Sequence, residues 1–188
     1  MAVPFASPTA ADRDILRWLA AHRGAGWTTL AKALMDLGLS VVFLGLALLA
    51  ALLTALVVRR LRPVIAAAGG AAVVSVVASQ ALKHLIARPR PDAALALVHA
   101  GGYSMPSTDA ALVAGLTAAA VLAARCTDRR CPRTLAAGAA ALNLLTGSAL
   151  VYLGVHWTTD VLAGWLLGGA VGTTVGALVR RRTPTARP

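Results

Sequence analysis

The chain is poor in charge, and one acidic residue type is missing altogether. Glu does not occur in its 188 residues; the seven acidic residues are all Asp, and charged side chains make up only 13%. A soluble domain normally carries about 25% charged residues. Hydrophobic residues instead reach 58%, with a mean hydropathy of +0.73. This balance excludes an ordinary soluble domain and predicts an integral membrane protein.

Cysteines and aromatic residues are also scarce. Aromatic side chains make up 4% of the chain, and its two cysteines, Cys126 and Cys131, lie in one polar segment without a nearby His. Two thiols do not complete a tetrahedral zinc site, so we expect free thiols, no metal and no cofactor. Residues 1–24 hold two Pro, two Asp and three Arg. Because they lack an apolar core, we expect no secretory signal there.

Long apolar segments fill most of the remaining sequence. They cover residues 39–58, 64–86, 108–124, 134–155 and 159–179. Each is close to the ~20 residues that a helix needs to cross a bilayer, which predicts an all-α bundle of about five to six transmembrane helices. Residues 28–37 are either a further short helix or the beginning of the first span.

An amphipathic pattern precedes the apolar segments. In residues 9–22, one helical face would carry Ile15, Leu16, Trp18 and Leu19, and the other Asp12, Arg13, Asp14 and Arg17. This pattern predicts a helix that lies in the membrane interface. The expected organisation is a tail and interfacial helix at residues 1–26, a membrane domain at 27–180 and a cytoplasmic tail at 181–188.

The net charge of +11 indicates topology rather than nucleic-acid binding, because the basic residues form short clusters between apolar segments. Eleven of the 18 are Arg59, Arg60, Arg62, Arg125, Arg129, Arg130, Arg133, Arg180, Arg181, Arg182 and Arg187. Helix alternation puts these clusters on one side, and the positive-inside rule makes that side cytoplasmic. Residues 88–106 and the turn at His156 are then expected outside, in a cell membrane that we expect to be bacterial.

Ionisable residues near the outer ends of the spans require an explanation, because they are costly in a membrane. They are Lys83, Arg88, Arg90, Asp109, His156 and Asp160, with Ser107 beside them. Lys and Arg provide positive charge, and a helix start provides free backbone N–H groups, so the set predicts an anion site. The i, i+4 spacing of His156 and Asp160 lets the carboxylate orient the imidazole, as a nucleophilic His requires.

Each of these residues also has a purely structural interpretation. Lys83 and Arg88 can extend to lipid headgroups, and Ser107 can simply cap a helix. Asp109 suits the first turn of a helix whatever its function. His156 and Asp160 can form a structural pair. A purely structural explanation of the whole set would require all of these interpretations to be true at once, for residues that lie at one membrane face.

Three segments together resemble the signature motifs of the type 2 phosphatidic acid phosphatase superfamily, over about residues 27–180. Lys83 to Arg90-Pro91 matches the first motif, Lys, six residues, Arg-Pro. The second motif, Pro-Ser-Gly-His, corresponds to Pro106-Ser107-Thr108-Asp109. In the third, Ser-Arg, five residues, His, three residues, Asp, the final pair is His156 and Asp160, and Ala149-Leu150 replaces Ser-Arg.

The resemblance implies a membrane enzyme that hydrolyses lipid phosphates or diphosphates without a metal. His156 would form a phosphohistidine and Asp160 would orient it. Lys83, Arg90 and Ser107 would bind the phosphoryl oxygens, and we add Thr108 and Arg88 as further substrate-binding candidates. Asp109 replaces a proton-donating His, a role worth about 10²–10⁴-fold in rate. Leu150 replaces an Arg that contacts the phosphoryl group.

The two replaced positions leave three functions open. The first is hydrolysis at the extracytoplasmic face, possible on a prenyl diphosphate because its phosphate leaving group depends less on an acid. The second is phosphoryl or prenyl transfer on a lipid phosphate, and the third is lipid-phosphate binding without catalysis. All three predict membrane lipid as the partner and no nucleic acid.

Overall fold

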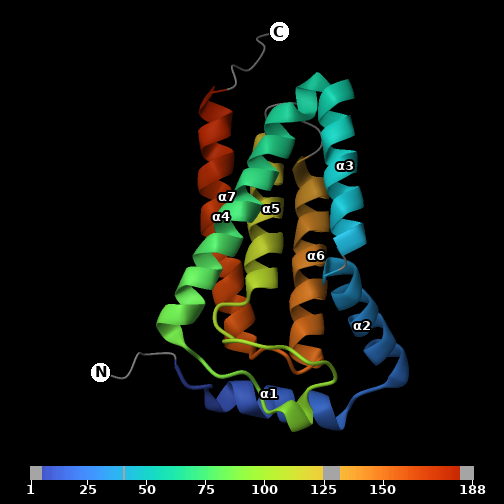
Figure 1. Ribbon diagram of the computed structural model, residues 1–188, viewed down its shortest axis with the longest axis vertical. Coiled ribbons are helices and arrows are strands. Elements are labelled where there is room, and N and C mark those ends of the chain that lie inside the picture. Colours follow the sequence, from blue (N-terminus) through green and yellow to red (C-terminus); the bar gives the residue numbers. More distant parts are fainter. Residues whose placement is uncertain (1–5, 40, 125–131, 183–188) are drawn as a thin grey trace.

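The structure, a computed structural model, is all-helical in the residues it describes, which are 6–39, 41–124 and 132–182. The elements are α1 (Ala10–Ala21), α2 (Ala25–Leu39), α3 (Val41–Val57), η1 (Arg59–Leu61), α4 (Arg62–Ile86), η2 (Ala93–Leu95), α5 (Thr108–Ala124), α6 (Pro132–Tyr152) and α7 (Thr158–Arg182). Helices α3 to α7 run side by side, and α1 lies across one end of the bundle (Figure 1). We call this end the α1 end. The predicted all-α membrane bundle with an N-terminal helix is confirmed.

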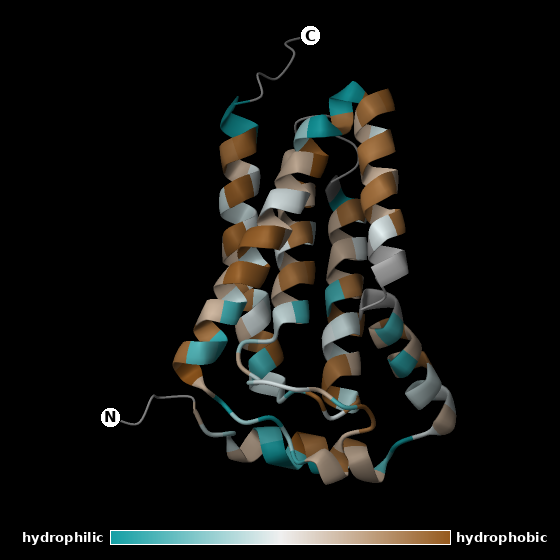
Figure 2. Ribbon diagram, viewed as in Figure 1, coloured by the Kyte–Doolittle hydropathy of each residue, from teal (hydrophilic) through white to brown (hydrophobic). Residues whose placement is uncertain are grey.

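Hydropathy marks the long helices as membrane segments. Among the described residues, Arg59–Ile86, Arg133–Tyr152 and Thr158–Arg182 are long and apolar enough to cross a bilayer, and Gly45–Val57 and Thr108–Ala124 are shorter apolar helices. Figure 2 shows hydrophobic residues along the long helices and hydrophilic residues mainly at the two ends of the bundle. Large apolar side chains such as Val57, Leu85 and Leu166 are exposed, as they would be against lipid tails. The number of spans stays a prediction.

Some expectations fall on residues outside the described ranges. These are the two cysteines, Arg125, Arg129, Arg130 and Arg187. The segment at 28–37 lies within α2, which ends at Leu39, and α3 begins at Val41. The division of the chain at residue 26 also stays a prediction.

Glycine brings α5 and α7 into close contact. Gly164, Gly168, Gly172 and Gly176 lie four residues apart on α7, so they share the helix face that packs on α5. A Cβ at Gly164 would lie 2.6 Å from the carbonyl oxygen of Ser107. Small residues at this spacing let membrane helices approach closely, and the approach extends up to the residue just before α5.

We expect Gly168→Ala to destabilise the protein by about 1–3 kcal/mol, because the new methyl overlaps rigid backbone. Its Cβ would collide with the carbonyl oxygen of Ala111 and lie 2.8 Å from the amide nitrogen of Gly115. Gly169→Ala is the matched control, since a Cβ there meets nothing within 4 Å. Thermal unfolding in detergent measures both, and equal melting temperatures would contradict the proposed packing.

Candidate active site

Residues from four parts of the chain meet in a polar cavity of about 340 Å³ at the α1 end. Its wall consists of Gln80, Lys83, His84, Arg90, Gly101, Gly102, Tyr103, Thr108, Asp109 and His156. The last turn of α4, the segment between α4 and α5, the start of α5 and the turn before α7 each contribute. The structure thus brings together five of the predicted site residues: Lys83, Arg90, Thr108, Asp109 and His156.

Backbone carbonyls hold the two cations of the cavity. The Lys83 ammonium donates a hydrogen bond to the carbonyl oxygen of Tyr103 at 2.8 Å. Arg90 Nε donates to the carbonyls of Gly101 and Gly102, at 2.9 and 3.2 Å. Burial lowers the pKa of Arg90, and the carboxylates of Asp160 and Asp109 oppose that shift. Both cations are therefore oriented toward the cavity by dipoles, and their charge stays available to an anion.

The imidazole of His156 lies between a carboxylate and a guanidinium. Its Nδ1 is 3.4 Å from Asp160 Oδ2, and its Nε2 is 3.3 Å from Arg90 Nη1. Both contacts are satisfied when Nδ1–H donates to Asp160 and the Nε2 lone pair accepts from Arg90, which is the neutral Nδ1–H tautomer. Burial lowers the pKa of His156, an effect that the hydrogen bond to Asp160 opposes and the charge of Arg90 reinforces. Neutral imidazole is the nucleophilic form.

A tight turn places His156. Gly154 has φ 75°, in the left-handed region, and a Cβ there would lie 2.5 Å from the carbonyl oxygen of Leu95. Leu97 N donates to the carbonyl of Leu153 at 2.8 Å, so this turn and the segment between α4 and α5 are joined. The turn therefore requires glycine both for its backbone conformation and for lack of space.

Ser107 has structural partners. It is fully buried just before α5, and its hydroxyl accepts a hydrogen bond from Ala110 N at 3.4 Å, as in a helix cap. Its backbone N–H donates to the carbonyl of Asp160 at 3.0 Å. It does not line the polar cavity, whereas the neighbouring Thr108 does. A direct contact between the Ser107 hydroxyl and substrate stays a prediction.

The structure gives Arg88 and Leu150 surroundings other than those expected. Arg88 is 1% exposed, contacts the carboxylates of Asp160 and Asp12 at 2.6 and 2.8 Å, and does not line the cavity. Its expected role in substrate binding therefore does not fit its position, because a buried guanidinium is held by its counter-ions. Leu150 is buried in an apolar core with Ala110. It cannot compensate for the Arg that it replaces.

Asp12 corrects the expected orientation of the N-terminal helix. The amphipathic pattern placed its side chain on the polar face, yet it is 1% exposed and shares the buried face with Leu16, one turn later. Trp18, expected on the apolar face, is exposed. One sequence feature could have indicated that the Asp12 side chain has structural partners. Thr9 and Asp12 have the spacing of a capping box, and the structure contains that capping box.

Five further residues line the cavity that were not predicted as site residues, and His84 and Tyr103 are the two with aromatic rings. His84 is exposed on the cavity wall, and its ring meets the ring of Tyr103 edge-on at 5.9 Å between centroids. The position of His84 directly after Lys83 was the sequence feature that could have placed it near the site. The cavity thus holds a second titratable imidazole beside Asp109.

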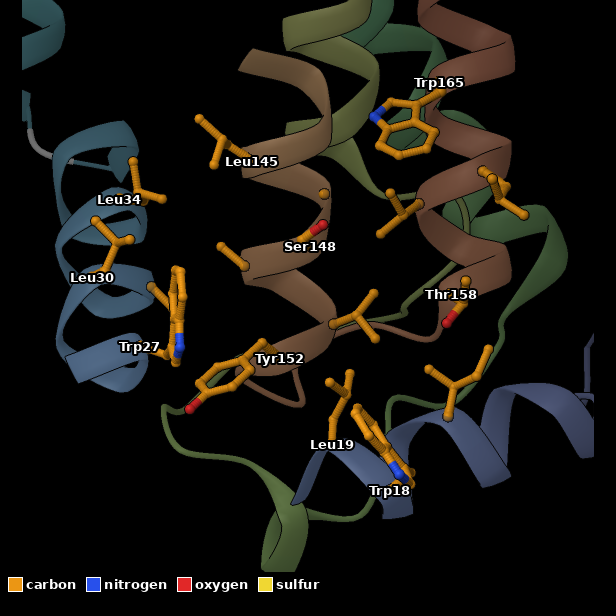
Figure 3. Close-up of a pocket in the computed structure, with 17 residues that line it drawn as sticks. Trp18, Leu19, Trp27, Leu30, Leu34, Leu145, Ser148, Tyr152, Thr158 and Trp165 are labelled. Atoms are coloured by element: carbon orange, nitrogen blue, oxygen red, sulfur yellow. The ribbon is translucent and has the colours of Figure 1, made fainter. Parts of the chain in front are cut away.

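A separate, apolar cavity of about 530 Å³ lies between α1, α2, α6 and α7 (Figure 3). Its wall includes Trp18 and Leu19 from α1, Trp27 and Leu34 from α2, and Trp165 from α7. It shares no lining residue with the polar cavity. Its composition suits a hydrocarbon chain and not a phosphate group.

The comparisons with known proteins agree with this fold and with the motifs. Residues 33–184 match the model of the PAP2 superfamily. A decaprenylphosphoryl-5-phosphoribose phosphatase of Mycobacterium tuberculosis, recorded for two strains, is 34% identical over 131 residues, which cover 70% of each chain. A PAP2-type phosphatidylglycerolphosphate phosphatase from Bacillus subtilis has a similar fold, with a TM-score of 0.77 and 23% identity over 95% of this chain and 88% of that one.

These matches define a class, that of membrane phosphatases with a helical bundle and a polar site at one end. The chain belongs to the PAP2 superfamily, as its three motifs had indicated.

We expect Gly154→Ala to impair the site more than Gly102→Ala. Both residues have positive φ, so Ala costs about 1 kcal/mol of backbone strain at each. Only at Gly154 does the new methyl also meet backbone, since a Cβ at Gly102 has nothing within 4 Å. A lower melting temperature and slower phosphate release in Gly154→Ala than in Gly102→Ala is the expected result. Equal melting temperatures and equal rates of phosphate release in the two variants would show that the turn at Gly154 can rearrange to accept a methyl group.

Proposed function

We propose that the protein removes phosphate from a lipid phosphate or diphosphate through a phosphohistidine at His156. The observation that carries this proposal is the imidazole of His156, whose Nε2 lies 3.3 Å from Arg90 Nη1 in a cavity shared with Lys83. Such a cavity combines a nucleophile with two cations for the phosphoryl oxygens. Membership of the PAP2 superfamily supports phosphate ester hydrolysis.

The proposed reaction has two steps. His156 Nε2 attacks phosphorus, the bond from phosphorus to the lipid oxygen breaks, and the lipid leaves. The phosphorylated ring carries a positive charge, which the carboxylate of Asp160 stabilises through Nδ1–H. Water then attacks phosphorus and gives a proton to the group that protonated the lipid oxygen in the first step. The bond from phosphorus to Nε2 breaks, and phosphate and the neutral ring are released. Lys83 and Arg90 stabilise the charge on the transferring group in both steps.

A proton donor for the leaving oxygen is available on the cavity wall. Asp109 takes the place of the family's second-motif His, and we propose that its protonated form is the acid, with His84 as the second candidate because it lines the same cavity. A lipid monoester leaves as an alkoxide and requires this proton. A diphosphate leaves as a phosphate ester and requires it less.

The proposed substrate carries a prenyl chain. The M. tuberculosis relative is a phosphatase of decaprenylphosphoryl-5-phosphoribose, a prenyl-linked phosphate. The apolar cavity of Figure 3 supports a hydrocarbon ligand near the α1 end. A prenyl diphosphate stays a second candidate, because its leaving group suits a site in which Asp109 replaces His.

We also propose that the site faces the extracytoplasmic side. Figure 1 shows the beginning of α4 and the end of α7 at the opposite end of the bundle from α1. Arg59, Arg60 and Arg62 lie at that opposite end, as do Arg180 to Arg182. The positive-inside rule places such clusters in the cytoplasm.

We expect His156→Ala to lower phosphate release from farnesyl monophosphate by about 10³-fold or more, as the loss of a nucleophile does. His99→Ala is the matched control, since His99 is exposed and does not line the polar cavity. Wild-type protein quenched in base should also carry a base-stable, acid-labile phosphoryl group that the His156 variant lacks. Undiminished release by His156→Ala would refute the proposed mechanism.

We expect Asp109→Asn to slow farnesyl monophosphate far more than farnesyl diphosphate, because only the monoester leaves as an alkoxide. The expected loss on the monoester is about 10²-fold or more. His84→Ala, measured on the same two substrates, tests the second candidate acid. A selective loss in His84→Ala alone would assign the proton to His84, and equal slowing of both substrates by Asp109→Asn would exclude Asp109 as the acid.

A further inference from the structure

A continuous row of buried charged groups leads from α1 to His156. Asp12 Oδ2 is 2.8 Å from Arg88 Nη2, and Arg88 Nη1 is 2.6 Å from Asp160 Oδ1. The other oxygen of Asp160 faces His156 Nδ1 at 3.4 Å. All four side chains are at most 2% exposed. A change at Asp12 therefore reaches the imidazole through two ion pairs that water does not screen.

Asp12 is held firmly as a carboxylate. Its Oδ2 accepts hydrogen bonds from Arg88, from the Thr159 hydroxyl at 2.7 Å and from the Thr9 N–H at 3.0 Å, and its Oδ1 accepts from the Thr159 N–H at 2.9 Å. Burial alone would raise the pKa of Asp12, but these donors outweigh it and lower the pKa to about 2. The group is thus ionised at any pH at which the protein would work.

The number of charges explains why a second carboxylate matters. Asp12, Arg88, Asp160 and neutral His156 sum to a net charge of −1, next to a ring that becomes positive when it is phosphorylated. Without the charge of Asp12 the sum is zero, because Arg88 then neutralises Asp160 completely. Arg88 alone would fix the position of Asp160, but its positive charge would cancel the stabilisation that Asp160 gives to the positively charged ring of His156. The negative charge of Asp12 offsets the charge of Arg88 and so restores that stabilisation.

We propose that Asp12 is a positioning residue for catalysis: through Arg88 and Thr159 it holds Asp160 in place and keeps the row of Asp12, Arg88, Asp160 and His156 at a net charge of −1. The N-terminal helix α1 is then part of the catalytic unit. Asp12 lies outside residues 33–184, the part that matches the PAP2 superfamily. The inference rests on the proposed role of His156 as nucleophile.

The central test is Asp12→Asn, which keeps the shape of the side chain and removes its charge. Because Lys83 and Arg90 are untouched, we expect kcat on farnesyl monophosphate to fall about 10- to 100-fold, as when a supporting partner is lost, with KM within about 2-fold. Asp14→Asn on the same helix is the matched control, because the Asp14 side chain is 75% exposed and its ion pair, at 3.9 Å, is with the exposed Arg17.

The pH profile gives a second readout. Among the described residues, the charged and titratable groups that contact His156 or line its cavity are Lys83, His84, Arg90, Tyr103, Asp109 and Asp160. Loss of the Asp12 charge makes the net field at His156 more positive, so the imidazolium is disfavoured further. The acid limb of kcat/KM should therefore move to lower pH in Asp12→Asn and stay in place in Asp14→Asn.

A double variant separates the charge effect from a merely structural one. Asp12→Asn with Arg88→Gln removes one charge of each sign and restores the net charge of −1, so the acid limb of kcat/KM should return toward its wild-type pH, even though loss of Arg88 also removes a support of Asp160. A merely structural role predicts no shift of the acid limb in either variant. That result, or an unchanged kcat in Asp12→Asn, would overturn the proposal.

Two further measurements keep the test decisive. If Asp12→Asn fails to fold, Thr159→Val removes the hydroxyl that bonds both Arg88 and Asp12. We expect its kcat to fall and Thr159→Ser to restore it, and a fully active Thr159→Val would then refute the proposal. His156→Ala is assayed in parallel: full activity there refutes the proposed function, whereas an inactive His156→Ala beside a fully active Asp12→Asn refutes this inference alone.

Discussion

A guanidinium buried between two carboxylates is the interaction on which the arrangement of this site depends. Arg88 lies in the segment after α4, Asp12 on α1 and Asp160 on α7, so one side chain fastens three separate parts of the chain. Removing one partner of a buried ion pair leaves an uncompensated charge, which costs about 3–5 kcal/mol. The two ion pairs therefore couple the stability of the three elements and link the docking of α1 to the position of Asp160.

Backbone geometry positions two of the partners in this interaction, Arg88 and Asp160. Ala87 ends α4 in the left-handed conformation at φ 53°, a position that usually holds glycine, and this turn directs the chain from Lys83 to Arg88. On the other side, the glycine face of α7 brings Ser107 close enough for its N–H to bond the carbonyl of Asp160. Helix packing deep in the bundle thus helps to determine where the Asp160 carboxylate lies, next to His156.

The sequence predicted the features that depend on local pattern. The length of the apolar segments predicted the long helices. The spacing of Lys83, Arg90, His156 and Asp160 predicted one site, because their motifs lie at helix ends that meet at one membrane face. The expected environment of Asp12 was wrong because hydrophobic periodicity assigns charged residues to the polar face. Arg88 was expected to contact substrate because it lies beside Arg90 in sequence, and this adjacency did not show that its charge is paired inside the protein. A charge that is buried with a partner 76 positions away leaves no local trace.

The partners of the three cations at the α1 end distinguish their roles. Arg88 contacts carboxylates, so its charge is cancelled within the protein. In the part of the chain that the structure describes, no ion pair joins Lys83 or Arg90 to a carboxylate; peptide carbonyls hold them instead. A carbonyl dipole orients a cation without neutralising it, so both cations keep their charge for an incoming anion. By this criterion, Lys83 and Arg90 are the proposed phosphate-binding pair, and Arg88, which lies between them in sequence, supports the proposed nucleophile through Asp160.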